Sequence, residues 1–346
     1  MSPASSSSRE PLAAIFGCRG AWLTDDERAF FRDANPAGFI LFQRNCENPD
    51  QTRELVAVLR DCVGRADAPV LIDQEGGRVA RLKPPQWRDY PAAAVLARTR
   101  TPRAAVFLAA RLIAHDLANL GITVDCAPVL DLLMPGADAI IGDRAFGTRP
   151  REVADLGRGF CEGLLAGGVL PVLKHIPGHG RATVDSHKAL PVVDAPKAVL
   201  EAADFVPFKD LADMPWAMTA HIVYRAIDPE HPATLSRRLI AETIRASIGF
   251  DGVLISDDLS MAALPGALPL RAKGAIAAGC DLVLHCNGDW VEMTAIAGSV
   301  GGITPMAQRR LARGEAMRRA LDGVNKSFDH RAAAARLDEL LGGAAS

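Results

Sequence analysis

The sequence predicts an α/β protein with a single domain, a closed (β/α)8 TIM barrel that carries extra C-terminal helices. Eight short apolar segments alternate with longer amphipathic ones, and most of the apolar segments are continuous rather than alternating. Continuous apolar runs suit parallel strands that are covered on both faces. Eight strand-then-helix units in a row favour a closed barrel. The alternative, an open doubly wound sheet, is less well supported because no GxGxxG follows the first strand.

The predicted strands are short apolar runs that end at turns or at polar residues. They are Leu12–Gly17, Gly38–Phe42, Pro69–Asp73, Ile122–Ala127, Val169–Lys174, Trp216–His221, Gly252–Ser256 and Asp281–His285. Polar side chains gather where several of these runs end: Asp73-Gln74-Glu75, Asp131, Lys174-His175, His221, Asp257-Asp258 and Asn287. Active sites of (β/α)8 barrels form at the C-terminal ends of the strands, so these residues predict a site on one rim.

The predicted helices repeat apolar residues at three- and four-residue spacing. They are Asp25–Arg32, Asp50–Val63, Ala104–Asn119, Glu152–Ala166, Lys197–Leu211, Ser236–Ser247, Leu270–Ala278, Trp290–Val300, Pro305–Leu321 and Asp329–Leu341. No Gly/Ser-rich linker divides residues 1–346, so we expect one domain. Within it, residues 1–10 are expected to be disordered, and the helices of residues 305–346 are expected to pack outside the barrel.

Composition excludes several classes of function. The net charge of −2 and the 5% aromatic content argue against nucleic-acid binding and against binding to an anionic membrane. No apolar run is long enough to cross a bilayer, and the polar first ten residues do not resemble a secretory signal. Seven cysteines, an odd number without CxxC spacing, favour a reducing compartment. We therefore expect a cytoplasmic protein. We also expect a monomer, although none of these features bears on the oligomeric state.

A histidine-rich segment offers acid/base chemistry. Lys174-His175-Ile176-Pro177-Gly178-His179-Gly180 is followed by Asp185-Ser186-His187, and its Pro and Gly content predicts a long loop after the fifth strand. Asp185 can accept a hydrogen bond from one imidazole nitrogen of His187, which leaves the other nitrogen free for proton transfer. The alternative is a histidine that only holds the loop against the barrel.

A zinc site is a second alternative for this segment, because His175, His179, Asp185 and His187 could supply three or four ligands. However, an HxxxH on a Pro-Gly loop lacks the helical geometry of HExxH. The first strand also carries no HxH. We therefore expect neither a metal nor another cofactor.

Two further strand ends carry candidate site residues. Asp257 and Asp258 should point to opposite faces of a strand, so one can face the barrel mouth while the other caps a turn near Leu259; alternatively both are caps. Asp73 and Arg81 can bind hydroxyl groups, or they can form a structural ion pair across the rim. Arg144 lies on the loop after the fourth strand, and its position alone does not indicate a functional role.

Taken together, KHIPGHG followed by DSH, ISDDLSM and IDQEGGRVARL resemble the family 3 glycoside hydrolases, and most closely their single-domain bacterial β-N-acetylglucosaminidases. The motifs run in the family's order from about Leu12 to about Asn287. The resemblance implies a TIM-barrel enzyme that releases terminal N-acetylglucosamine from muropeptides carrying 1,6-anhydro-N-acetylmuramic acid, during peptidoglycan recycling.

The resemblance also implies residue roles. Asp257 corresponds to the nucleophile, His187 to the general acid/base, and Asp185 to its supporting carboxylate. The sugar-binding positions are Asp73, Arg81, Arg144, Lys174, His175 and His221. The sequence departs from the family at Ile176, where Phe is usual, at Asp143, where Glu is common, and at Ala262–Gly266, where relatives often have Glu-Gly-Ala. None of these changes removes a catalytic group, but the last one affects the expected shape of the pocket.

These roles predict a retaining hydrolase that forms a covalent glycosyl-enzyme. Because a histidine acid/base carries no negative charge, phosphate could replace water as the acceptor, and a phosphorylase is a same-class alternative. A non-catalytic muropeptide-binding barrel is an alternative of another class, although it would not need the nucleophile or the Asp-His pair.

Overall fold

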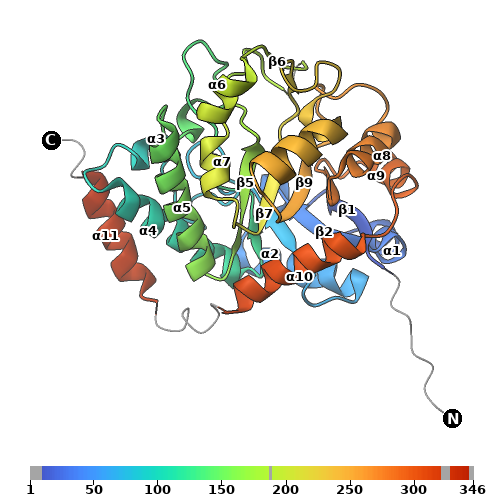
Figure 1. The fold of residues 1–346 in the computed structure, drawn as a ribbon. Helices are drawn as coiled ribbons and strands as arrows, with labels where there is room; N and C mark the ends of the chain where they lie inside the picture. Colours follow the sequence, from blue (N-terminus) through green and yellow to red (C-terminus); the bar gives the residue numbers. More distant parts are fainter. Residues whose placement is uncertain (1–9, 187–188, 321–327, 343–346) are drawn as a thin grey trace.

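Eight parallel strands close into a barrel in the computed structural model, which describes residues 10–186, 189–320 and 328–342. The order around the barrel is β1-β10-β9-β7-β5-β4-β3-β2, and Figure 1 labels several of these strands. The strands are β1 Leu12–Gly17, β2 Pro36–Leu41, β3 Val70–Ile72, β4 Val124–Asp125, β5 Leu170–Ile176, β7 Trp216–Thr219, β9 Val253–Asp258 and β10 Leu282–His285. The predicted fold class is therefore confirmed, and all eight predicted strands overlap observed ones.

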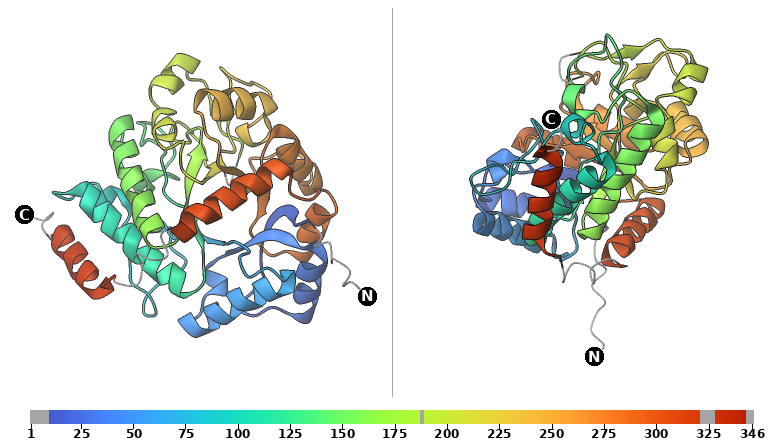
Figure 2. Two further views of the ribbon diagram at one scale, coloured as in Figure 1. Left: turned by 60° about the horizontal axis from the view of Figure 1, so that its bottom comes forward. Right: turned by 90° about the vertical axis from the view of Figure 1, so that its left-hand side faces the viewer.

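Helices surround the barrel (Figures 1 and 2), and each of them has buried residues. They are α1 Asp25–Ala34, α2 Pro49–Val63, α4 Pro102–Asn119, α5 Pro150–Ala166, α8 Leu268–Ala278 and α9 Trp290–Ala297. Local sequence sets their ends. Thr24 and Glu27 form a capping box at the start of α1, and Asn48 accepts a hydrogen bond from the Gln51 N–H at the start of α2.

Two predicted helices differ from the structure. The segment predicted as one helix, Lys197–Leu211, is two: α6 Lys197–Ala202 and α7 Val206–Asp210. Pro207 cannot donate a helical hydrogen bond, so the chain breaks before it and Pro207 falls in the first turn of α7. The helix predicted over Ser236–Ser247 is observed as the π-helix η4 Leu239–Ser247, and a 3-10 turn, η3 Ala233–Leu235, precedes it.

Several very short elements have no sequence signature, because they are too short for any periodicity to show. They are α3 Ala93–Leu96, the 3-10 turns η1 Gln43–Asn45 and η2 Gly142–Arg144, and the two-stranded sheet of β6 Val192–Val193 with β8 Val223–Tyr224. The small sheet lies beyond the C-terminal end of β5, in the connections that follow β5 and β7.

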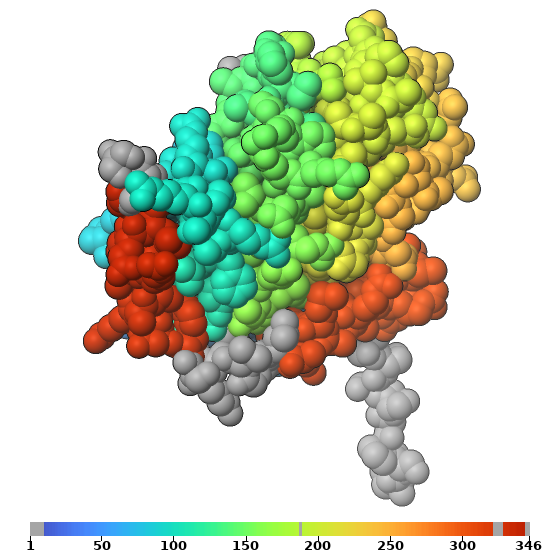
Figure 3. All heavy atoms as spheres, turned by 60° about the vertical axis from the view of Figure 1, so that its left-hand side comes forward, coloured from blue at the N-terminus to red at the C-terminus, as the bar shows by residue number. Residues whose placement is uncertain are grey.

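The two C-terminal helices lie outside the barrel. α10 Pro305–Ala320 crosses the end where the strands begin, and Gly314 allows it to approach Trp216 (Figure 2). α11 His330–Gly342 packs on α4, as the red and teal surfaces of Figure 3 show. Within the described ranges, no helix combines the length and the apolar character that a membrane span requires.

Candidate active site

A cavity of about 220 Å³ opens at the C-terminal rim of the barrel. Six of the predicted site residues line it: Asp73, Arg81, Arg144, Lys174, His175 and Asp257. A larger cavity, about 490 Å³, lies at the opposite end beneath α10 and is lined mainly by apolar side chains. Cavity size therefore does not locate the site. The site is located by the convergence of charged groups at the C-terminal ends of several strands.

Alternating charges form a network on one side of this cavity. Lys174 Nζ lies 2.9 Å from Asp73 Oδ1 and 2.6 Å from Glu75 Oε1. Arg81 donates to Asp73 Oδ2 at 3.0 Å, and Arg144 donates two hydrogen bonds of 2.8 Å to Glu75. The structural ion pair considered for Asp73 and Arg81 therefore exists. Because both residues also line the cavity, the pairing is compatible with ligand binding.

Burial and charge together keep this network ionised. Burial raises the pKa of the Glu75 carboxyl, but Lys174 and Arg144 outweigh it and lower that pKa to about 2. Burial likewise raises the pKa of Asp73, and Lys174 and Arg81 bring it well below its usual range. Burial lowers the pKa of Lys174, but the charges of Asp73 and Glu75 outweigh burial, so the pKa of Lys174 is raised above its usual value. At neutral pH the cavity therefore presents fixed charged donors and acceptors.

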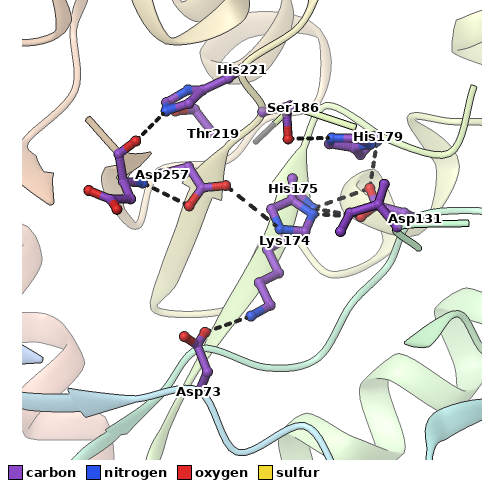
Figure 4. Close-up of polar contacts among 12 residues, drawn as sticks. Asp73, Asp131, Lys174, His175, His179, Ser186, Thr219, His221 and Asp257 are labelled. Carbon is purple, nitrogen blue, oxygen red and sulfur yellow. Dashed lines mark hydrogen bonds and ion pairs between the residues drawn. The ribbon is translucent and has the colours of Figure 1, made fainter. Parts of the chain in front are cut away.

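The two acids that end β9 have different surroundings, as strand alternation predicted. Asp257 Oδ2 lies 3.9 Å from His175 Nε2 (Figure 4), and both residues line the cavity. The Asp258 carboxylate instead accepts hydrogen bonds from the Ser260 N–H at 3.1 Å, the Ser260 hydroxyl at 2.6 Å and the Cys286 N–H at 3.3 Å. Asp258 thus ties down the turn after the strand, while Asp257 remains available to a ligand.

Lys174 lies on strand β5, as predicted, and the strand continues beyond its predicted end to Ile176, so His175 also belongs to the strand and not to the loop predicted there. The strand extends because its backbone still pairs with β7 as far as Thr219. This placement holds the two side chains on the barrel wall rather than on a loop. His175 Nδ1 lies 2.7 Å from Asp131 Oδ2, and the loop proper begins at Pro177.

His221 lies behind the cavity. Its Nδ1 is 2.7 Å from Thr234 Oγ1, and its Nε2 is 3.1 Å from the Asp258 carbonyl oxygen (Figure 4). It is buried and is not among the residues that line the cavity. Burial lowers its pKa, and the nearby Asp257 partly opposes that shift. The structure therefore places His221 where it supports the end of β9.

The segment that carries the predicted acid/base pair is described in part. His187 lies outside the described residues. Asp185 is described, and the adjacent Ser186 lines the cavity. His179 Nε2 is 3.3 Å from Ser186 Oγ, and burial, followed by the charge of His175, lowers the pKa of His179 to about 4. Over the ranges that the structure describes, no three His, Cys, Asp or Glu side chains are grouped so that they could hold a metal ion.

Glu75 and Asp131 were predicted to lie on the rim that carries the site, but neither was given a role, and Phe42 was not predicted as a site residue. Glu75 stands within the IDQEGGRVARL segment, so its motif was a usable signal. Phe42 lies under the Arg81 guanidinium, 5.1 Å from carbon to ring centroid, and nothing in its sequence context marks it.

A closed barrel with a carboxylate, imidazoles and a charged network on its C-terminal rim defines a (β/α)8-barrel enzyme. Residues 18–313 match the glycosyl hydrolase family 3 N terminal domain. The chain therefore belongs to glycosyl hydrolase family 3, as its motifs predicted.

Relatives of known class and structure cover most of the chain. A β-hexosaminidase of Alkalilimnicola ehrlichii is 43% identical over 282 residues, and the match covers 79% of this chain and 80% of that protein. A β-hexosaminidase of Pseudomonas aeruginosa is 40% identical over 271 residues, 78% of this chain and 80% of that protein. The crystal structure of NagZ from Neisseria gonorrhoeae in complex with N-trifluoroacetyl-D-glucosamine superposes with a TM-score of 0.85 at 31% identity, covering 96% of this chain and 99% of that one.

Proposed function

We propose that this family 3 glycoside hydrolase is a retaining exo-β-N-acetylglucosaminidase. Its substrates would be muropeptides in which N-acetylglucosamine is linked to 1,6-anhydro-N-acetylmuramic acid, and its place would be peptidoglycan recycling in the cytoplasm. Two relatives at 43% and 40% identity carry the name β-hexosaminidase, which supports the coarser class of β-N-acetylhexosaminidase. The glucosamine derivative bound by the Neisseria protein supports an N-acylated amino sugar as the glycone.

The observation that carries the proposal is the position of Asp257. Its carboxylate lines the cavity, faces His175 and is not used to cap the turn after β9. Burial raises its pKa, but His175 and His221 outweigh burial and give a net lowering. An ionised carboxylate that lines a cavity of about 220 Å³ is suited to attack an anomeric carbon.

In the proposed reaction His187, oriented by Asp185, protonates the glycosidic oxygen while Asp257 attacks the anomeric carbon. The aglycone leaves and a covalent glycosyl-enzyme forms. His187 then removes a proton from water, which attacks the same carbon and releases the sugar with retained configuration. The histidine thus acts first as an acid and then as a base.

The charged network would bind the hydroxyl groups of the glycone. Asp73 accepts hydrogen bonds, while Lys174 and Arg81 donate them. These groups are already ionised and held by one another, so binding requires little reorganisation. We therefore assign Asp73, Arg81, Arg144, Lys174 and His175 to glycone binding, and His221 to support of the nucleophile strand.

The test is an NMR time course on N-acetylglucosaminyl-1,6-anhydro-N-acetylmuramic acid, with and without phosphate. The proposal predicts that β-N-acetylglucosamine appears first and later mutarotates, with phosphate having no effect. Formation of N-acetylglucosamine 1-phosphate would instead establish a phosphorylase. Tight binding of the disaccharide with no product would point to a non-catalytic binding protein.

A further inference from the structure

One fully buried carboxylate, Asp131, connects both sides of the candidate site. It lies on the connection after β4, six residues beyond Asp125, and it does not line the cavity. We propose that Asp131 is a positioning residue: it fixes which nitrogen of His175 faces Asp257, and it anchors the turn that begins the loop leading to Asp185. This inference rests on the proposed function and adds a residue to its machinery.

The contacts of Asp131 define a fixed geometry. Its Oδ2 lies 2.7 Å from His175 Nδ1, and its Oδ1 accepts hydrogen bonds from the backbone N–H groups of His175 at 3.2 Å and His179 at 2.6 Å (Figure 4). Its side chain is 0% exposed, so water does not compete for these bonds. One carboxylate therefore holds the ring of His175, the end of β5 and the start of the following turn.

This arrangement selects one tautomer of His175. An ionised carboxylate only accepts hydrogen bonds, so at 2.7 Å it requires the proton on Nδ1. The other neutral tautomer would place the Nδ1 lone pair against a carboxylate oxygen in a buried site, which is unfavourable. His175 Nε2 is then the nitrogen directed at Asp257, 3.9 Å away.

The choice of tautomer matters for the proposed chemistry. With Nδ1–H engaged by Asp131, Nε2 offers a lone pair to a sugar hydroxyl, and it can donate a hydrogen bond to the Asp257 carboxylate only when the ring is protonated. A ring held in the opposite neutral tautomer would keep a permanent N–H directed at the nucleophile. That N–H would stabilise the Asp257 carboxylate in the ground state and make it a weaker nucleophile.

The same carboxylate relates the end of β5 to the turn at Pro177–Gly180. The His179 N–H is held by Asp131, and the His179 ring reaches Ser186 Oγ at 3.3 Å. Through this chain of contacts, Asp131 sets the relation between His175 on β5 and the residue next to Asp185. Loss of its charge should therefore disturb the chemical step more than glycone binding.

The first experiment uses the unmodified protein. ¹⁵N-edited NMR of the histidine rings, with His175 assigned by comparison with the His175→Gln variant, reads the tautomer directly. The inference predicts a His175 ring protonated on Nδ1 at a pH where it is neutral. A neutral ring protonated on Nε2 would overturn it without any substitution at Asp131.

The second experiment is Asp131→Asn. Asparagine can keep its oxygen toward the two backbone N–H groups while its NH2 group faces His175 Nδ1, which forces the proton to Nε2. We expect the NMR signals of His175 to show the other tautomer. We also expect kcat to fall at least about thirtyfold, because a histidine held in the wrong tautomer in an active site lowers the rate of the chemical step. The inhibition constant of N-acetylglucosamine should change less than about threefold.

Asp281→Asn is the matched control. Asp281 is also buried, pairs with Arg245 and Arg310 at 2.9 Å each, and accepts the Leu254 N–H at 2.9 Å, but it lies where β10 begins, at the opposite end of the barrel. The Asp281→Asn substitution should lower Tm, while kcat should stay near the wild-type value. An equal loss of kcat in both variants, or an unchanged His175 tautomer in Asp131→Asn, would contradict the inference.

Asp257→Ala separates the two levels of the proposal. If it keeps wild-type turnover, the proposed function itself is wrong. If it is inactive while Asp131→Asn retains wild-type kcat, the proposed function stands and only the role of Asp131 is refuted.

Discussion

The backbone N–H of Asp258 donates a hydrogen bond of 2.8 Å to Oδ1 of the Asp257 carboxylate. The second acid of the pair therefore helps to fix the first, while its own carboxylate is engaged by Ser260 and Cys286. Oδ2 of Asp257 remains directed toward His175 and the cavity. This asymmetry gives the two adjacent carboxylates separate functions.

The first prediction concerns this pair. Asp257→Ala should lower kcat at least about a thousandfold on an aryl β-N-acetylglucosaminide, because the attacking group is lost. Asp258→Asn should lower Tm, through about 1–2 kcal/mol of weakened hydrogen bonding, and should leave kcat within about tenfold. A folded Asp258→Asn protein as inactive as Asp257→Ala would show that the two roles have been exchanged.

The second prediction concerns Glu75, which holds Arg144 and Lys174. Glu75→Gln should lower the free energy of unfolding by about 3 kcal/mol at pH 7, because two buried cations lose a partner. The folded pKa of Glu75, about 2, is below its ordinary value. Its stabilising contribution is therefore fully present above about pH 4.5 and is lost as the pH falls toward 2.

Urea unfolding of the wild-type protein and of Glu75→Gln at pH 7 and pH 3 tests whether the stabilising contribution of Glu75 decreases as the pH falls. The difference in unfolding free energy between the two proteins should be smaller at pH 3. A difference that is equal at both pH values, or larger at pH 3, would mean that the Glu75 carboxylate is not held ionised as the contacts indicate.

The third prediction concerns Arg144 and its two parallel hydrogen bonds to Glu75. Arg144→Lys keeps the charge but cannot reproduce the forked geometry, so KM should rise about tenfold while kcat changes only a few-fold. Arg158→Lys is the matched control, because Arg158 makes a similar forked pair with Asp213 on the surface, at 3.1 and 2.8 Å. Equal effects of the two substitutions on KM would argue against a role for Arg144 in glycone binding.

The fourth prediction concerns the packing of α11 on α4. The rings of His115 and His330 stack with centroids 4.8 Å apart, and Phe328 lies 5.8 Å from His115. Burial first, then the charges of His330 and Arg111, lower the pKa of His115. The unfolded chain then binds a proton more readily, so stability is lost as the pH falls below about 6.5.

Hydrogen exchange of the α11 amides, corrected for intrinsic rates, should show lower protection at pH 5.5 than at pH 7.5. His115→Gln should remove most of this pH dependence. If the variant retains the full dependence, other groups control the packing of α11.

The sequence was informative wherever a feature is local. Continuous apolar runs marked the eight strands, and polar residues at their ends marked Asp73, Lys174 and Asp257 as neighbours on one rim. The break before Pro207 is also a local feature, and the proline was a usable signal for it, although the prediction of one continuous helix over Lys197–Leu211 missed it. By contrast, the Glu75–Arg144 pair joins residues 69 positions apart, and no sequence spacing indicates which acid meets which arginine.

The contact between Asp131 and His175 is another long-range contact that sequence spacing does not indicate. β4 is only two residues long, yet the chain continues alongside β5, with the Leu130 N–H bonded to the Lys174 carbonyl at 2.8 Å. This continuation of the chain beyond the end of β4 places Asp131 against His175. A strand predicted to end at Ala127 gives no indication of this contact, which depends on how the closed barrel brings β4 and β5 together.

The most direct test of the account is identification of the nucleophile in a trapped intermediate. The protein would be incubated with a 5-fluoro N-acetylglucosaminyl fluoride, because fluorine destabilises the oxocarbenium-like transition state and slows breakdown of the glycosyl-enzyme. Peptide mass spectrometry should then find one added 5-fluoro-N-acetylglucosaminyl unit, attached to Asp257. Attachment to Asp258 or to any other residue, or continued turnover with no covalent adduct, would contradict the account.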